Sequence, residues 1–249
     1  MKHTFYLNLA AFMSFFLLSK NNYAQPSYVD TVSRQPVIDN IIANYTIAIG
    51  HQSRLYNGPE YDFYDRLIKG SAYFKDTPDF VIADVEYDGF VFKGLSVLYD
   101  LNKDAVVMQL PSKIASIELL SPMVQRFDIL GHHFKRMDPA YNSNMQGLVA
   151  GFYDQLYTGK TTFIAKREKV IQNNTSGVLD RYFTSELMRM YLFYNGAYRS
   201  FTNKNSMLDI LRDKQTELKQ FIKQNHLKFR QTREDSMIKV VAYYDQITK

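Results

Sequence analysis

The sequence predicts an α+β protein in which an antiparallel meander sheet, curved or half-barrel, is packed by an N-terminal helix and two C-terminal helices. Three observations support this prediction. Short runs rich in Tyr, Phe and β-branched residues alternate with turn signals from about residue 74 to residue 201. Between these runs there is no helical pattern that could form a parallel crossover. Two amphipathic patterns follow over residues 205–248, and their apolar faces need a surface to cover.

The first 24 residues have the order of segments that a signal peptidase recognises. Lys2 and His3 make a basic start, an apolar stretch runs from Phe5 to Leu18, and Ala24 stands just before the expected cleavage. An uncleaved membrane anchor is the alternative, but the stretch is shorter than the roughly 20 apolar residues that span a bilayer. We therefore expect residues 1–24 to be removed and the protein to be periplasmic or secreted, with no transmembrane segment afterwards. Residues 25–249 then have the length of one α+β domain.

The chain contains no cysteine. An acylated N-terminal cysteine is therefore excluded, so the protein is not expected to be a lipoprotein, and thiol chemistry and disulfides are excluded as well. Charge is unevenly placed: residues 25–159 carry 11 Lys and Arg and 16 Asp and Glu, whereas residues 160–249 carry 17 and 9. We interpret the basic part as a solvated helical face, and we expect no nucleic acid partner, because an exported protein rarely meets nucleic acid.

The N-terminal helix is expected over residues 35–49. Apolar residues recur there at helical spacing, Asp39 lies near the start, and Gly50 follows the last apolar position as a stop signal. One face of this helix would be apolar and would need to pack against the rest of the domain.

The apolar period changes to two from Phe74 onward, which predicts strands in this part of the chain. A strand over 80–87 leads into a strand over 90–99 through Asp88-Gly89, a favoured hairpin turn because both positions tolerate positive φ. Asn195-Gly196 between two aromatic runs is the clearest hairpin signal in the chain. In all, about nine strands are expected; the others cover residues 105–110, 114–120, 127–137, 147–157, 161–172, 187–194 and 197–201.

Two amphipathic helices are expected after the last strand. Ser206, with Asp209 three residues later, matches a capping box and would begin a helix that ends near Asn225. Thr232 with Asp235 repeats the pattern for the second helix. The apolar stripes of both helices would be buried most simply against the open face of the sheet.

The motifs assign no catalytic residue, no cofactor and no metal ligand. Gly159-Lys160-Thr161 matches the end of a phosphate loop, but Asp154 stands where that motif requires glycine. His132 and His133 are neighbours on an expected strand and would point to opposite faces, which disfavours a shared metal. The acids of residues 84–88 alternate along one strand face, a pattern that is typical of the solvated side of a sheet.

Five short segments carry a resemblance to a family: Phe92–Leu95, Val97–Leu101, Tyr191–Tyr198, Ser206–Lys214 and Tyr243–Asp245. They are similar to segments of uncharacterised exported proteins of Gram-negative bacteria, a domain of unknown function. The resemblance covers about residue 80 to the end, and it implies export without assigning a functional residue. A curved sheet with helices against it also resembles periplasmic lipoprotein carriers, which is a likeness of fold alone.

These features favour a non-catalytic binding or scaffolding role in the bacterial envelope, with an envelope protein or an apolar ligand as the partner. A periplasmic carrier of a lipid-like ligand is the alternative. In that case Tyr87, Phe92 and Tyr153 are the expected lining residues. A hydrolase whose site is assembled from scattered residues is a further alternative.

Overall fold

The computed structural model describes residues 38, 54–145, 147–174 and 180–248. The expected signal segment, residues 1–24, lies outside the described residues, and so does the expected helix over residues 35–49 apart from Ile38. Contacts between Cα atoms divide the chain into two units, Met1–Gly50 and His51–Lys249. The second unit contains the sheet and the C-terminal helices, and it is described here by itself.

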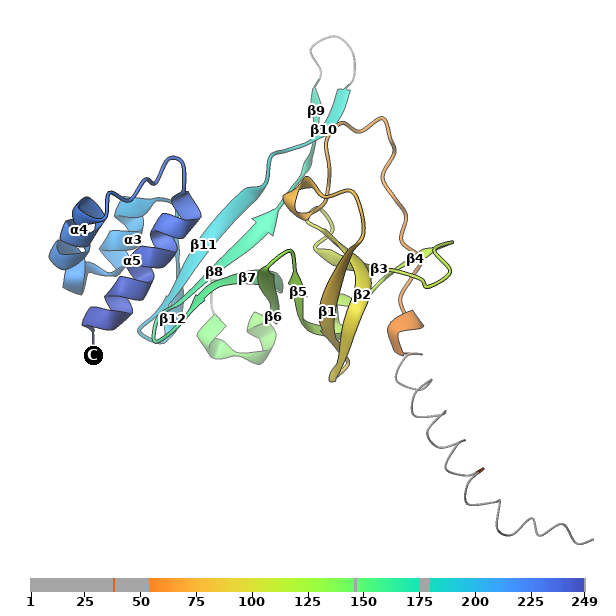
Figure 1. The fold of residues 1–249 in the computed structure, drawn as a ribbon, viewed down its shortest axis with the longest axis horizontal. Helices are drawn as coiled ribbons and strands as arrows, with labels where there is room; N and C mark the ends of the chain where they lie inside the picture. The colour runs from red at the N-terminus through yellow and green to blue at the C-terminus, as the bar shows by residue number, and fades with distance from the viewer. Residues whose placement is uncertain (1–37, 39–53, 146, 175–179, 249) are drawn as a thin grey trace, which may run out of the picture. The chain divides into compact units, whose positions relative to one another are not determined.

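In the described part of the chain, ten strands form one antiparallel sheet that does not close on itself (Figure 1). The strands of the unit are β1 (Val81–Tyr87), β2 (Phe90–Asp100), β3 (Ala105–Gln109), β4 (Ser116–Glu118), β5 (Val124–Ile129), β6 (His132–Met137), β7 (Gly151–Thr158), β8 (Thr162–Glu168), β9 (Ile171–Asn174), β10 (Asp180–Phe183), β11 (Leu187–Tyr194) and β12 (Ala197–Phe201). The order in the sheet is β12-β11-β8-β7-β6-β5-β1-β2-β3-β4, while β9 and β10 pair with each other. The predicted antiparallel α+β class is confirmed.

Three hairpins in the described chain use a two-residue turn in which both residues have positive φ. Asp88-Gly89 (51° and 79°) joins β1 to β2, and Asn195-Gly196 (51° and 80°) joins β11 to β12, as predicted. Leu130-Gly131 (50° and 77°) joins β5 to β6 in the same way. The prediction of a single strand over residues 127–137 is therefore wrong. The sequence did not indicate this hairpin, because its first turn position is a leucine, and leucine rarely adopts positive φ.

Lys169 interrupts the strand that was expected over residues 161–172. Its side chain is buried, and Nζ donates hydrogen bonds to the carbonyl oxygens of Ser71 at 2.8 Å and Tyr73 at 3.1 Å, and pairs with Asp76. β8 ends just before this residue and β9 begins just after it. Lys169 therefore anchors the chain segment that precedes β1 against the sheet.

Asp100 at the end of β2 is a second buried anchor. One carboxylate oxygen accepts hydrogen bonds from the hydroxyls of Tyr61 at 2.7 Å and Tyr64 at 2.8 Å, and the other accepts from the backbone N–H groups of Asn102 and Lys103. Several hydrogen bonds offset the cost of removing this carboxylate from water. The four donors fix both the turn after β2 and the irregular segment before β1.

Three helices follow β12 within the described C-terminal part: α3 (Lys204–Ile210), α4 (Gln215–Gln224) and α5 (Arg233–Ile247). Two helices were expected, but the first is divided after Leu211 by a short 3-10 turn. The capping box of α3 is formed by Asn203 and Ser206, so the predicted pair of Ser206 with Asp209 is wrong. Thr232 precedes α5, but its side chain makes no cap hydrogen bond there.

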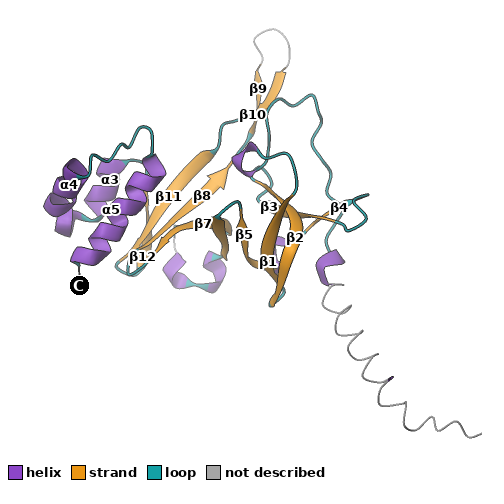
Figure 2. Cartoon of the chain, in the orientation of Figure 1, coloured by secondary structure: helices purple, strands orange, loops and turns teal. Residues whose placement is uncertain are grey.

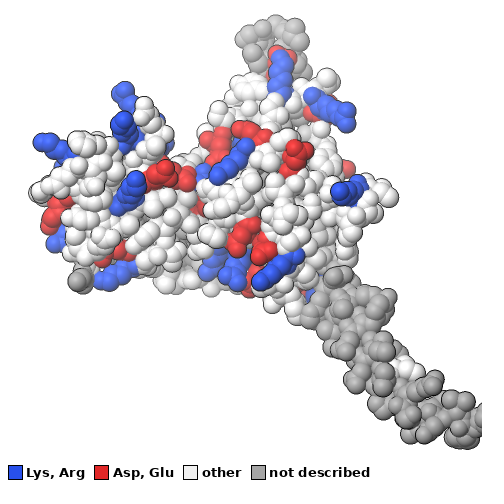
Figure 3. All heavy atoms as spheres, viewed as in Figure 1, with Lys and Arg blue, Asp and Glu red and all other residues white. Residues whose placement is uncertain are grey.

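The helices gather beside one end of the sheet (Figure 2), and their apolar residues share a cluster with the strands there. The cluster combines Phe163, Met190, Leu192 and Phe201 from β8, β11 and β12 with Met207, Leu211, Leu218, Met237 and Val240 from the helical part. Figure 3 shows Lys and Arg side chains spread over the outer surface of these helices, as expected of a solvated basic face. None of the described helices has both the length and the apolar character needed to cross a bilayer.

A second cluster lies under β1, β2, β5 and β6 and is rich in aromatic rings. Phe127 and Phe134 stack with ring centroids 4.9 Å apart, and Tyr99 meets both rings edge-on. Phe74, from the segment before β1, contacts Phe134 and closes the cluster. The alternation that predicted β1 follows from this packing, because Val85 and Tyr87 are fully buried on the inner face.

Candidate functional site

A groove lies beside the first residues of β2, which the β2–β3 ladder does not reach. The two strands pair from Asp100↔Ala105 to Val97↔Met108, and among the described residues no pairing with β3 continues along residues 91–96. Beyond Met108 the chain turns away, because the N–H of Leu110 donates to the carbonyl oxygen of Ala115 at 3.1 Å. β2 therefore keeps β1 on one side along residues 91–96 and faces the groove on the other.

A β-bulge at Gly94 shapes the same stretch of β2. The register steps from Ala83↔Leu95 to Val85↔Phe92, which leaves two residues of β2 opposite one residue of β1. Gly94 has φ of +68°, and its N–H donates to Oδ1 of Asp84 at 3.0 Å. A glycine is favoured at this position because positive φ is costly for other residues. The bulge bends β2 where the groove begins.

The groove has a volume of about 890 Å³ and is open to solvent along one side. Its walls come from both faces of β2: Phe92 packs toward the core opposite Val85, whereas Val91 lies on the outer face opposite Glu86. Side chains from both faces can line one groove only if the groove runs along the edge of the strand. The remaining walls include Phe80, Ile82, Met108, Leu110 and Pro111, with Asp79, Lys93 and Lys113 as the charged residues.

Two apolar side chains of the groove are unusually exposed. Ile82 is 71% exposed and Val91 is 54% exposed, and they lie on adjacent strands. Exposed apolar residues that occur singly need no explanation, but exposed apolar side chains that line one hollow are typical of a binding surface. This groove is the candidate binding site.

The structure separates the three residues that the sequence suggested as ligand lining. Phe92 lines the groove. Tyr87 is fully buried in the aromatic cluster, and its hydroxyl donates to Oδ1 of Asn57 at 2.6 Å. Tyr153 is fully buried in another cluster, and its hydroxyl bonds to the backbone of Val149. Ile82 is an apolar residue on the face of β1 that also carries Asp84 and Glu86, and this pattern could have indicated a binding surface there. No sequence signal indicated where the β2–β3 ladder ends.

A buried charge network is the second polar feature of the fold. Arg167 on β8 is 6% exposed and donates to Oδ2 of Asp154 from Nε and Nη2 at 2.8 and 2.6 Å. The same guanidinium donates to Glu186 at 2.6 Å and to Glu234 at 2.7 Å. Burial lowers the pKa of Arg167, but the attraction of Asp154 and Glu234 outweighs burial and raises it overall. Arg167 therefore stays charged and neutralises part of a carboxylate cluster.

His132 is the second partner residue of Asp154, after Arg167. Its Nδ1 lies 2.7 Å from Oδ2 of Asp154, and Phe74 covers the ring at a centroid distance of 5.0 Å. His133, the next residue, is exposed and lies 2.6 Å from Asp128. The two histidines thus point to opposite faces of β6, as predicted from their position on a strand.

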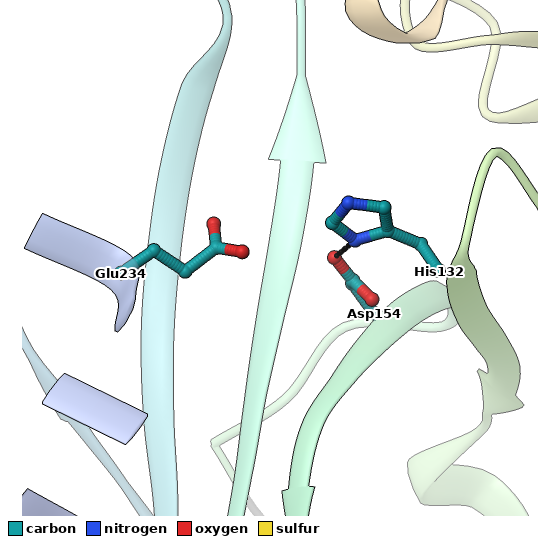
Figure 4. Close-up of side chains that lie close together, drawn as sticks. All are labelled: His132, Asp154 and Glu234. Atoms are coloured by element: carbon teal, nitrogen blue, oxygen red, sulfur yellow. Dashed lines mark hydrogen bonds and ion pairs between the residues drawn. The ribbon is translucent and has the colours of Figure 1, made fainter. Parts of the chain in front are cut away.

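The donor atoms of His132, Asp154 and Glu234 lie within 4.8 Å of one another, a spacing that a metal ion could use (Figure 4). Figure 4 shows the Glu234 carboxylate directed from α5 toward the other two side chains. However, Arg167 donates to both carboxylates and already supplies the positive charge between them. A metal ion would have to displace this guanidinium. The arrangement therefore fits an ion-pair network that links the sheet to α5 better than it fits a metal centre.

Comparisons with family models, curated proteins and solved structures find no match for this chain. The resemblance to exported proteins of Gram-negative bacteria therefore stays a prediction from the sequence.

Proposed function

We propose that this protein is an exported, non-catalytic binding protein of the bacterial envelope, and that the groove along β2 binds a segment of a partner. The proposal is carried by the interrupted β2–β3 ladder, which leaves apolar side chains exposed in a groove of about 890 Å³. Burying such a surface against a partner would supply about 25 cal/mol for each Å² of apolar area. Export is supported by the order of segments in residues 1–24.

The open shape of the groove favours a partner segment over a carried lipid. A carrier site encloses most of the surface of its ligand. This groove is open along one side, and Asp79, Lys93 and Lys113 stand among its apolar walls. Of the three residues expected to line a lipid cavity, only Phe92 takes part. We therefore rank the carrier function below partner binding.

A peptide-display selection on the purified chain tests the proposal. Random peptides that bind the wild-type protein are collected and then measured against Ile82→Asp, which places a charge on the groove wall. We expect the dissociation constant to rise at least about tenfold, because a buried apolar contact contributes about 1.5 kcal/mol or more.

The matched control is Leu67→Asp. Leu67 is 83% exposed and does not line the groove, so the same change in chemistry should leave peptide binding within a factor of about two. Selected peptides that bind both variants as tightly as the wild type, or a selection that yields no binder, would contradict a binding function for the groove.

A further inference from the structure

The unpaired stretch of β2 differs from the two ends of the sheet. β4, at one end of the sheet, is covered by residues 59–61 of the segment that precedes β1. The N–H of Glu118 donates to the carbonyl of Pro59 at 2.9 Å, and the N–H of Tyr61 donates to the carbonyl of Ser116 at 2.8 Å. Gly58 permits this approach, because a Cβ there would overlap the carbonyl oxygen of Glu118. Proteins commonly cover sheet edges to prevent unwanted pairing.

The other end of the sheet is covered as well. β12 contacts Ser143–Met145, in the connection between β6 and β7, and Tyr198 packs against the apolar cluster that contains Leu148. In the described sheet, residues 91–96 of β2 have no ladder pairing with β3 and line the groove, and only the Ser96 hydroxyl reaches β3, at the side chain of Gln109. An edge that is left open beside an apolar groove is a place where another strand can pair.

The backbone of β2 supplies a regular set of hydrogen-bonding groups along this edge. In an antiparallel strand, alternate residues direct both their N–H and C=O groups to one neighbour and the residues between them direct both to the other. Residues 91–96 pair with β1 on one side, so every second residue presents its backbone groups to the groove, apart from the local distortion at Gly94.

We propose that the groove takes an extended peptide that adds to residues 91–96 as a strand, and that the peptide carries acidic residues among alternating apolar ones. This inference rests on the proposed binding function and specifies its ligand. Side chains on one face of the added strand would meet Phe92 and Leu95, and those on the other face would meet Ile82 and Val91. Because successive side chains of a strand point to opposite faces, apolar residues are expected on the face that meets Phe92 and Leu95, and acidic residues on the face toward the exposed Lys93.

The charges of the groove select an acidic peptide. Lys93 and Lys113 line the groove and are both exposed, and Asp79 is the acidic residue among the lining side chains. Neither lysine has an ion-pair partner within 4.0 Å in the described structure. The lining side chains therefore include two lysines and one aspartate, and this excess of positive charge favours an anionic partner.

The test uses a labelled seven-residue probe that alternates valine with aspartate, and its binding to the purified chain is followed by fluorescence anisotropy. Two N-methylated forms are compared, one methylated on every valine amide and one on every aspartate amide. Strand addition places one of these two sets of amides against β2. We expect one form to bind at least about tenfold more weakly and the other to stay within about threefold of the parent probe.

The charge part of the proposal is tested with the double variant Lys93→Glu, Lys113→Glu. We expect it to weaken the acidic probe at least about fivefold at low salt and to weaken it less at high salt, because exposed charges are screened. A probe with lysine in place of aspartate should bind the wild-type chain more weakly than the acidic probe. Equal binding of both probes would overturn the charge preference.

The outcomes separate this inference from the binding function on which it rests. If the probe binds and Ile82→Asp abolishes binding, but both methylated forms bind equally well, strand addition is wrong and the groove function stands. If no probe binding is sensitive to Ile82→Asp, both proposals fail. If sedimentation shows that the chain dimerises and Ile82→Asp abolishes the dimer, the edge belongs to a second copy and the peptide partner is wrong.

Discussion

Arg167 on β8 and Glu234 in the first turn of α5 form an ion pair, with 2.7 Å between Nη2 and Oε2. The pair connects the sheet to the last helix of the chain. Asp154 and Glu186 form ion pairs with the same guanidinium, so three carboxylates share one cation in a largely buried site. Asp154 is 1% exposed, and its Oδ1 has no hydrogen-bond partner among the described residues. The charge on Asp154 is therefore stabilised through Oδ2 by Arg167 and His132.

We expect Arg167→Ala to lower the free energy of unfolding by about 3–5 kcal/mol, because it leaves a buried carboxylate without its cation. Urea denaturation at pH 7 measures this loss. Lys69→Ala is the control: Lys69 pairs with Asp180 at the surface, with 68% of its side chain exposed, so its loss should cost less than about 1 kcal/mol. Similar small losses in both variants would show that the Arg167 network contributes little to stability.

Stability should fall at alkaline pH as buried tyrosines ionise. Burial raises the pKa of Tyr153 to about 12, above its ordinary value of about 10. The unfolded chain therefore loses this proton first, so the contribution of Tyr153 is complete below pH 10 and is lost as the pH rises toward 12.

The variant Tyr153→Phe cannot lose that proton. Between pH 10 and pH 12 it should lose up to about 2 kcal/mol less stability than the wild type. Tyr141→Phe serves as the control, because that ring is 89% exposed, and its pH dependence should match the wild type. Denaturation at roughly pH 10, 11 and 12 gives the comparison, and identical slopes for all three chains would refute the expectation.

A larger residue at Gly151 would force neighbouring side chains to move. Its φ is +148°, and a Cβ there would overlap Oδ2 of Asp104 and Nζ of Lys166, which form an ion pair. We expect Gly151→Ala to cost about 2–4 kcal/mol, since it combines backbone strain with overpacking. Gly131→Ala, at φ of +77° with open space around a Cβ, isolates the backbone cost of about 1–2 kcal/mol. Thermal unfolding of the two variants should therefore rank Gly151→Ala as the less stable.

The capping of α3 distinguishes the observed helix start from the one predicted by the motif. The side chain of Asn203 accepts hydrogen bonds from the N–H groups of Asn205 and Ser206 at 2.9 and 3.1 Å. Asn203→Ala should therefore cost about 1 kcal/mol in unfolding free energy. Asp209→Ala, which alters the residue predicted by the sequence motif, should cost clearly less. The reverse order would place the start of α3 at Ser206.

Cleavage of the leader is tested by mass spectrometry of the protein recovered from its native host. We expect the mature chain to begin at Gln25, because Ala24 is the small residue that precedes the apparent cut. Recovery of a cytosolic protein that still begins with Met1 would contradict export.

Local signals predicted the hairpins well. Asp88-Gly89 and Asn195-Gly196 fix both the turn and the register of the flanking strands, since both positions adopt positive φ without large cost. Leu130-Gly131 takes the same conformation without a favourable first residue, so the packing of Phe127 against Phe134 must hold that turn. The hairpin was missed because its stability comes from contacts across the pair.

The candidate groove depends on features that no single segment encodes. Phe92 was among the lining residues expected for a carrier, but the groove exists because β3 is shorter than β2. The Arg167 network brings together β6, β7, β8 and α5, whose pairing follows from the order of strands in the sheet. Sequence periodicity gives the faces of each strand and does not give the neighbour that each face or edge meets.

The pairing of Asp84 with Asp128, in the middle of the sheet, has a consequence for how the polypeptide can be divided. A break in the turn at Ser121–Met123 would give two fragments, one ending with β4 and the other starting with β5. Each fragment would leave one strand edge unpaired, that of β1 in one fragment and that of β5 in the other, and the partner strand would lie in the other fragment. The two halves should therefore reassemble when mixed, which makes this protein suited to split-reporter complementation.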